Sequence, residues 1–281
     1  MAAAPVPSWL AISPALEEHI PLLAICATVQ VLAFVPCLLW VKRQWPEHKD
    51  PCSLADTLIS LLIFPALAVS AIAGAWSLRS DVESRWHGIA GASSFHMTLY
   101  MTRSLIHCFM QPFQDMTPMH LALMTLHHIL SMLSYGCGMV TGRCHFWACF
   151  NGCCEMSTIF LNNHYLSKQI TIGGKELKAV MPNWVTALNG LFIWMAFLVF
   201  RLMLFPTWLY LWYSDVMSAP ERTWEVSNTV ERYVYAPVTL FLLVISTYWF
   251  VPVTKGLLKA LGCSCKSACC RKKGKTSCKT D

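Results

Sequence analysis

The sequence predicts an all-α polytopic membrane protein with seven transmembrane helices. Of its 281 residues, 56% are hydrophobic and 13% are charged, and the mean hydropathy is +0.48, which is more apolar than a typical soluble domain. Its apolar runs repeatedly reach the roughly 20 residues that cross a bilayer core of about 30 Å. The expected spans are 20–41, 54–78, 87–111, 119–140, 144–166, 183–213 and 234–254.

The first two spans contain few polar side chains. No basic stretch and no small-residue cleavage site precede the first apolar run, so we expect that run to remain in the protein as an anchor, with Gln30 as its one strongly polar residue. In the second span Pro65 is expected to kink the helix. Asp56 lies near the cytosolic end of this span, and we interpret it as an acid at the membrane surface.

The third span is the most polar of the seven. His96, Tyr100, Arg103 and His107 follow one another by four, three and four residues, so they form one stripe that must face protein or water. An arginine inside a helix bundle needs a counter-ion, and Glu155 is the nearest acid by depth. An ion pair between Arg103 and Glu155 would either belong to a functional site or be purely structural.

The fourth and fifth spans form a hairpin over 119–166, joined by the short turn Thr141-Gly142-Arg143. At 100° per residue each arm carries one polar stripe, and the tight turn makes the two stripes face each other. Ionisable groups at this depth are costly and usually functional, although a lone histidine can simply bridge two helices. The stripes are His120, His127, Ser131 and Ser134 on the first arm and Asn151, Glu155, Thr158 and Asn162 on the second.

The remaining segments carry weaker signals. Gly173 and Gly174 predict a turn in the basic loop 167–182. The sixth stretch exceeds thirty residues, so it is either steeply tilted or broken near Pro206. Loop 214–233 mixes acids and bases and is expected to be a solvated surface. An exoplasmic aromatic belt is expected from Trp208, Tyr210, Trp212 and Tyr213.

Charge predicts the orientation. An exoplasmic N-terminus and a cytosolic C-terminus place fourteen of the 21 Lys and Arg residues on the cytosolic side, as the positive-inside rule requires. The inner loops hold Lys42, Arg43, Lys49, Lys168, Lys175 and Lys178, and the tail holds eight more. The net charge of +6 therefore indicates contact with the anionic cytosolic leaflet, and no motif for nucleic acid is present.

The cysteines do not suggest a disulfide framework, because the larger exoplasmic loops contain none of the fourteen. Four of them stand beside basic residues after the last span, which favours S-palmitoylation over a zinc site. These are Cys263, Cys265, Cys269 and Cys270. The expected organisation is an N-terminal segment with the first span (1–53), a six-helix domain (54–258) and a cytosolic tail (259–281).

The ordered set of motifs resembles the TLC-domain family, which includes ceramide synthases. The resemblance rests on His127-His128 in the fourth helix, EMSTIFLN over 155–162 and FLVFR over 197–201, and it spans roughly 55–258. It implies a TLC-type barrel of six helices around a lipid-accepting cavity, with the first helix outside it. It also implies a place in the endoplasmic reticulum or another endomembrane.

The resemblance assigns roles to residues of both stripes. In ceramide synthases the matching histidine pair transfers a fatty acyl group from acyl-CoA, the co-substrate, to a sphingoid base. The catalytic residues implied are His127, His128 and Glu155. The substrate-binding residues implied are His96, Tyr100, Arg103, Ser131, Asn151, Asn162 and Arg201.

This chain departs from the synthases at the positions where they or the family carry His or Asp. Here these positions are Met101, Trp147, Ala148 and Asn151. The sequence therefore resembles more closely the branch linked to membrane lipid composition. The expected function is lipid or acyl-chain binding in lipid homeostasis, with or without acyl transfer.

Other functions stay open. A zinc hydrolase would use His96, His120 and His128, and a seven-helix receptor shares the topology. No tightly bound cofactor is expected, and a homodimer is left open.

Overall fold

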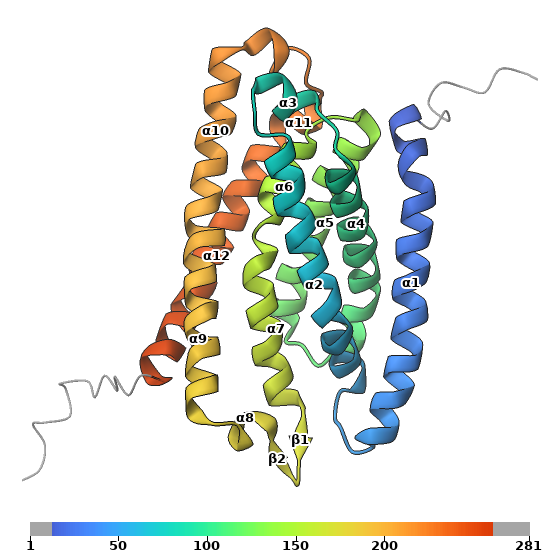
Figure 1. Cartoon of the computed structure of the whole chain (residues 1–281), viewed down its shortest axis with the longest axis vertical. Helices are drawn as coiled ribbons and strands as arrows, with labels where there is room; N and C mark the ends of the chain where they lie inside the picture. The colour runs from blue at the N-terminus through green and yellow to red at the C-terminus, as the bar shows by residue number, and fades with distance from the viewer. Residues whose placement is uncertain (1–12, 261–281) are drawn as a thin grey trace, which may run out of the picture.

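A computed structural model describes residues 13–260 as a long bundle of helices (Figure 1). Short elements cap the bundle at both ends. The elements are α1 (Pro14–Gln44), α2 (Pro51–Ser77), α3 (Val82–His87), α4 (Gly91–Met110), η1 (Gln111–Phe113), α5 (Pro118–Thr141), α6 (His145–Gly152), α7 (Glu155–Gln169), β1 (Thr171–Ile172), β2 (Lys175–Glu176), α8 (Leu177–Val180), α9 (Asn183–Phe197), η2 (Leu198–Met203), α10 (Leu204–Ser218), η3 (Pro220–Arg222), α11 (Thr229–Tyr233) and α12 (Tyr235–Ala260).

Four helical stretches are long and apolar enough to cross a membrane, which makes the chain an integral membrane protein. They are Pro14–Gln44, Pro51–Ser77, Asn183–Ser218 and Thr229–Lys259. Helices α4 and α5 and the pair α6–α7 run alongside them (Figure 1) but are more polar. Burial among the other helices explains how these more polar segments are accommodated.

Helix α1 lies at the outer edge of the bundle, against α2 and α4 (Figure 1). Its side chains are mostly exposed, and its few polar groups point inward. The Gln30 side-chain amide donates to Thr102 Oγ1 at 2.8 Å, and His19 Nδ1 lies 3.3 Å from Thr98 Oγ1. The first helix is therefore an outer helix that is held by a small number of polar contacts.

The predicted hairpin turn is present, but its second arm is not one continuous helix. Gly142 ends α5 with φ +65°, and α6 follows at once. The chain then breaks at Cys153 and Cys154 before α7 begins at Glu155. Around the break the backbone forms i→i−3 bonds, such as Ser157 N to Cys154 O at 3.1 Å, which tighten the turn and redirect the chain.

The long sixth stretch is interrupted by the π-helical segment η2, ahead of Pro206. Pro206 has no N–H, and its ring would clash with the carbonyl of Leu202 in a regular α-helix. Widening the preceding turn relieves this clash. The break thus falls a few residues before the expected position, and it places Arg201 inside the widened segment.

The expected aromatic belt is wrong for two of its four members. Trp208 and Trp212 are buried, and their rings stack at 4.9 Å. They pack on Trp86 and Trp147, and the Trp208 indole N–H donates to the Trp147 carbonyl at 3.0 Å. Helical spacing puts 208 and 212 on one face, and that face points into the bundle.

Loop 214–233 forms a cap that is only partly the expected solvated surface, because two of its acids are buried in ion pairs. Asp215 accepts from both Arg85, at 2.6 and 2.8 Å, and the Trp86 indole, at 3.1 Å. Glu231 is fully buried and pairs with Arg143 at 2.6 Å. Two of the four acids of this loop, Asp215 and Glu231, are therefore buried partners of arginines from α3 and from the α5–α6 turn, whereas Glu221 and Glu225 are exposed.

The opposite end of the bundle carries the predicted glycine turn. Gly173 and Gly174 have φ +58° and +75° and join the two short strands β1 and β2. Helix α12 ends at this end of the bundle, whereas α1 begins at the end that carries α3 and α11 (Figure 1). The chain therefore passes along the bundle an odd number of times between the start of α1 and the end of α12.

Candidate functional site

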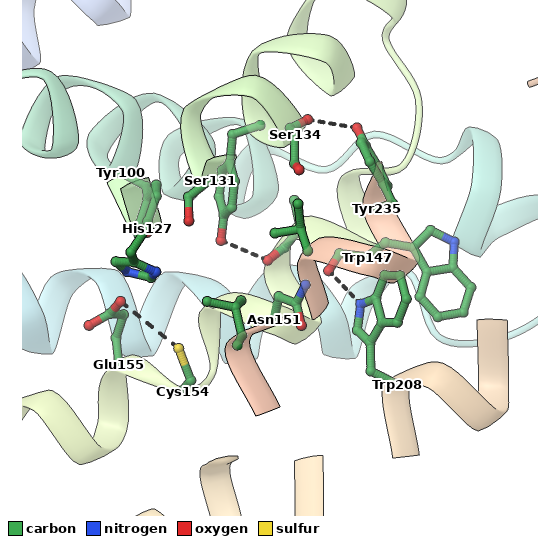
Figure 2. Close-up of a pocket in the computed structure, with 15 residues that line it drawn as sticks. Tyr100, His127, Ser131, Ser134, Trp147, Asn151, Cys154, Glu155, Trp208 and Tyr235 are labelled. Atoms are coloured by element: carbon green, nitrogen blue, oxygen red, sulfur yellow. Dashed lines mark hydrogen bonds between the residues drawn. The ribbon is translucent and has the colours of Figure 1, made fainter. Parts of the chain in front are cut away.

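A small internal cavity gathers polar side chains of α4, α5, α6 and α7 in the middle of the bundle (Figure 2). Its volume is about 30 Å³, which is enough for one or two water molecules, since a single water needs about 10–15 Å³. Aromatic and aliphatic residues of α10 and α12 close one side. The lining residues are Tyr100, His127, Ser131, Ser134, Tyr135, Trp147, Ala148, Asn151, Gly152, Cys154, Glu155, Trp208, Tyr235, Val238 and Leu242.

His127 and Glu155 face the same end of this cavity. Figure 2 shows the carboxyl group of Glu155 pointing toward the ring of His127. Glu155 is only 7% exposed, yet it forms no ion pair within the described residues, and its contact with Cys154 Sγ is long, at 4.0 Å. The break between α6 and α7 positions this carboxyl group, because Glu155 is the first residue of α7.

Three cavity residues have polar atoms that are buried without a hydrogen-bond partner in the described part of the chain. These atoms are Nδ1 of His127, Nε1 of Trp147 and Oδ1 of Asn151. The Asn151 amide nitrogen is bonded, donating to Thr239 Oγ1 at 3.0 Å. A buried polar atom without a partner costs about 1–3 kcal/mol, so a bound water or a polar ligand would stabilise this arrangement.

Tyr100 and Tyr135 form one wall of the cavity, with their rings stacked at 4.4 Å. The Tyr135 hydroxyl lies 3.2 Å from His96 Nε2 and donates to the Ala148 carbonyl at 2.9 Å. His96 is fully buried behind this wall. Its ring fits because residue 152 is glycine: a Cβ there would lie 2.1 Å from His96 Nε2.

Arg103 does not pair with Glu155, and the expectation of that pair is wrong. Its guanidinium contacts Asp56 at 2.8 and 3.0 Å and Ser60 Oγ at 2.7 Å. Asp56 is therefore an interior acid, 7% exposed, and not an acid at the membrane surface. The i, i+4 spacing of Asp56 and Ser60 was the available sequence signal, since it puts both on one face of α2.

The two adjacent histidines of α5 have different surroundings. His127 lines the cavity, whereas His128 Nε2 lies 3.0 Å from Nδ1 of His107 on α4. Neighbouring residues on a helix diverge by about 100°, which explains why they cannot serve the same partner. The sequence pattern treated them as one pair; in the structure their ring centres lie 5.1 Å apart, but only His127 lines the cavity.

Arg201 is buried beside α7 without a carboxylate partner in the described residues. Its Nε donates to Ser157 Oγ at 2.7 Å, its Nη2 donates to Thr158 Oγ1 at 3.2 Å, and its guanidinium lies 4.9 Å from the Phe197 ring centre. Thr158 therefore faces Arg201 and not the cavity. Asn162 is also turned away, toward α2, where its amide donates to the Thr57 carbonyl at 2.9 Å.

The histidines of the zinc alternative do not come together. His120 is exposed near the start of α5, while His96 and His128 bond to different partners. Across residues 13–260, no group of three or more His, Cys, Asp or Glu side chains is arranged to hold a metal ion. The tail cysteines, Cys263, Cys265, Cys269 and Cys270, lie outside the described residues.

Comparison with known proteins gives one finding. The family model described as the TLC domain matches residues 56–255, which is well over half of the chain. No curated protein and no solved structure matches the sequence. The matched range includes every residue that lines the cavity.

Proposed function

The chain belongs to the TLC-domain family, and we propose that it binds a lipid or fatty acyl chain inside its bundle and acts in lipid homeostasis. One observation carries this proposal. The cavity holds an ionisable pair, His127 and Glu155, together with unpartnered polar atoms in the middle of an apolar bundle. Such groups are costly in a membrane, and the polar part of a lipid would satisfy them.

The ligand enters a cavity that opens to admit it, because 30 Å³ holds water only. The polar group of the lipid lies against His127, Asn151 and Glu155. Its hydrocarbon chain extends between α10 and α12, where Val238 and Leu242 line the same cavity.

The chemistry that fits this cavity best is acyl transfer from acyl-CoA. His127 takes a proton from an attacking amine or hydroxyl group, and Glu155 orients its ring. The nucleophile forms a new bond to the acyl carbon as the carbon–sulfur bond breaks, and the thiol leaves with the proton. Ser131, Tyr100 and Asn151 hold the acyl oxygen and the nucleophile by hydrogen bonds.

A second candidate is lipid binding without catalysis, and a specific observation favours it. Where ceramide synthases carry His and Asp, this chain has Trp147 and Ala148, whose carbonyls accept from Trp208 and Tyr135. These positions support the cavity wall and offer no acid or base. In this case the protein binds a lipid or a cargo and regulates membrane composition.

Mass spectrometry of lipids that co-purify with the full-length protein tests the proposal. Wild type should carry a defined lipid in near-stoichiometric amount, and His127→Ala and Asn151→Ala should lose it. The matched control is His87→Ala, which removes a histidine at the end of the bundle, bonded only to the Arg222 carbonyl. Equal lipid content in wild type and both cavity variants would contradict lipid binding at this site.

Incubation of the purified protein with acyl-CoA and a sphingoid base separates the two candidates. Amide formation that disappears in His127→Ala supports acyl transfer. Retained lipid binding without product supports the non-catalytic function.

The orientation is also a proposal, with all seven helical stretches crossing an endomembrane. The end with β1, β2 and α8 carries exposed lysines such as Lys42 and Lys168, and we place it in the cytosol. At the opposite end Arg85 and Arg143 are neutralised by Asp215 and Glu231. A protease added to sealed microsomes should remove a C-terminal tag and spare an N-terminal one, and removal of both tags would contradict this orientation.

The basic tail is proposed to contact the anionic cytosolic leaflet and to be palmitoylated. Hydroxylamine-sensitive labelling should disappear when Cys263, Cys265, Cys269 and Cys270 are all replaced by Ser. Labelling that persists would place the acylation elsewhere.

A further inference from the structure

A chain of polar contacts leads from α2 to His128 of α5. Asp56 Oδ2 accepts from Arg103 Nη2 at 3.0 Å and lies 3.3 Å from His107 Nε2. On the other side of the same ring, His107 Nδ1 lies 3.0 Å from His128 Nε2. The ring of His128 is 5.1 Å from that of His127, measured between ring centres. The polar contacts thus connect a buried carboxylate to His128, whose ring packs beside that of the cavity residue His127.

The direction of the hydrogen bonds in this chain follows from the carboxylate. An ionised carboxylate only accepts hydrogen bonds, so the His107 nitrogen that faces it carries the proton. In a neutral ring the other nitrogen, Nδ1, is then an acceptor. His128 Nε2 must donate to it, which leaves His128 Nδ1 as a lone-pair nitrogen. This Nδ1 is buried and has no partner among the described residues.

The Asp56 carboxylate already has a cationic partner in Arg103. A doubly protonated His107 would reverse the direction of the second hydrogen bond, because both its nitrogens would donate. However, Arg103 already neutralises Asp56 through two contacts, at 2.8 and 3.0 Å. A second buried positive charge beside the same carboxylate would have no negative partner left and would be strongly disfavoured.

We infer that Asp56 and His107 are positioning residues that fix the tautomer of His128 and hold its ring beside His127. The effect of this positioning on lipid binding rests on the proposed function, whereas the geometry of the contacts does not. With the proton fixed on Nε2, His128 presents a second proton acceptor next to the cavity histidine. This positioning role also explains why an acid, an arginine and a second histidine are buried together in α2 and α4.

Nitrogen NMR of the full-length protein, labelled with ¹⁵N-histidine in lipid nanodiscs, tests the tautomer directly. The His128 signals, assigned by their absence in His128→Gln, should show an unprotonated Nδ1 and a protonated Nε2. The opposite pattern, or a doubly protonated His107, would overturn the inference. Neither outcome depends on whether a lipid binds, so failure of the proposed function stays distinguishable.

Two substitutions at His107 then separate positioning from packing. His107→Leu preserves bulk and cuts the chain, so His128 should show a mixture of tautomers and lipid retention should fall at least several-fold. His107→Gln offers a donor to Asp56 and an acceptor to His128, and it should restore both signals toward wild type.

His145→Leu is the matched control, since it removes a buried histidine that bonds Ser93 Oγ at 3.0 Å outside the chain of contacts. It should leave the His128 tautomer unchanged. Loss of the tautomer in both His107→Gln and His145→Leu would show that general packing sets it, and would overturn the inference. Should His107→Leu not fold, the wild-type spectrum and His107→Gln still decide the question.

Discussion

The end of the bundle that carries α3 and α11 (the capped end) and the centre of the bundle both contain buried arginines and carboxylates. The two regions differ in whether these charges are paired. At the capped end Arg85 and Arg143 each meet a buried carboxylate at 2.6 Å. In the centre Glu155 and Arg201 are equally buried, and neither forms an ion pair in the described part of the chain. Breaking a buried pair on one side is strongly destabilising, and a buried charge without a partner is retained at a cost to stability. The comparison agrees with the proposed site in the centre and indicates a structural role for the ion pairs at the capped end.

The largest expected loss of stability comes from breaking the Arg85–Asp215 ion pair at the capped end. Asp215→Ala leaves Arg85 and the Trp86 indole without their common partner, which should cost about 3–5 kcal/mol, as for other buried pairs broken on one side. Thermal melting of the detergent-purified protein should show a large decrease in Tm. The double variant Arg85→Met, Asp215→Leu removes both charges and should recover most of it. A wild-type melting curve for Asp215→Ala would contradict this role.

Gly152→Ala should also reduce stability, because the new methyl group would lie 2.1 Å from His96 Nε2 and 3.1 Å from the Tyr135 hydroxyl. Overpacking of this kind costs about 1–3 kcal/mol. The control is Gly190→Ala in α9, where a Cβ would meet nothing within 4 Å and where alanine favours the helix. Melting temperatures should fall for the first and stay equal or rise for the second. The reverse order would refute the role of Gly152.

Arg201→Met should cost less stability than Arg103→Met. The former removes hydrogen bonds to two hydroxyls, each worth about 0.5–1.5 kcal/mol, whereas the latter leaves Asp56 buried without its main partner. If Arg201 also holds an anionic group of the ligand, its variant should lose bound lipid despite nearly normal folding. A larger loss of Tm for Arg201→Met than for Arg103→Met would contradict the difference between the paired and the unpaired arginine.

Glu155→Gln should have the smallest effect on stability. No cation within ion-pair distance loses its partner, and the amide retains the shape of the carboxyl group, so the melting temperature should stay close to that of wild type. Lipid retention or acyl transfer should nevertheless fall strongly, because the ring of His127 loses its orienting carboxylate. A variant with reduced stability and intact function would make Glu155 a structural residue.

The sequence could predict the elements whose signals are local. The spacing of His96, Tyr100 and Arg103 predicts one buried face of α4, and all three are buried. Gly142 has the left-handed conformation that favours glycine at a tight turn. These outcomes depend on helical geometry alone, so a single stretch of sequence contains enough information.

Partners between distant segments could not be predicted in this way. Asp56 and Arg103 are 47 residues apart, and their pairing depends on how far α2 and α4 slide along each other. The depth of each residue in the membrane, as inferred from hydropathy, pointed to Glu155 as the partner of Arg103 instead. Similarly, the break at Cys153 and Cys154 carries no proline, and Trp208 and Trp212 have the composition of an interface belt while facing the core.

The central claim is that the polar part of a lipid lies beside His127 within the bundle. Photo-crosslinking with a lipid that carries a diazirine close to its polar group, followed by peptide mapping, tests it most directly. The account predicts crosslinks on α5 and on α6–α7, around His127, Asn151 and Glu155, that excess natural lipid competes away. Crosslinks confined to outward-facing residues, such as Leu32 of α1 and Trp184 of α9, would contradict it.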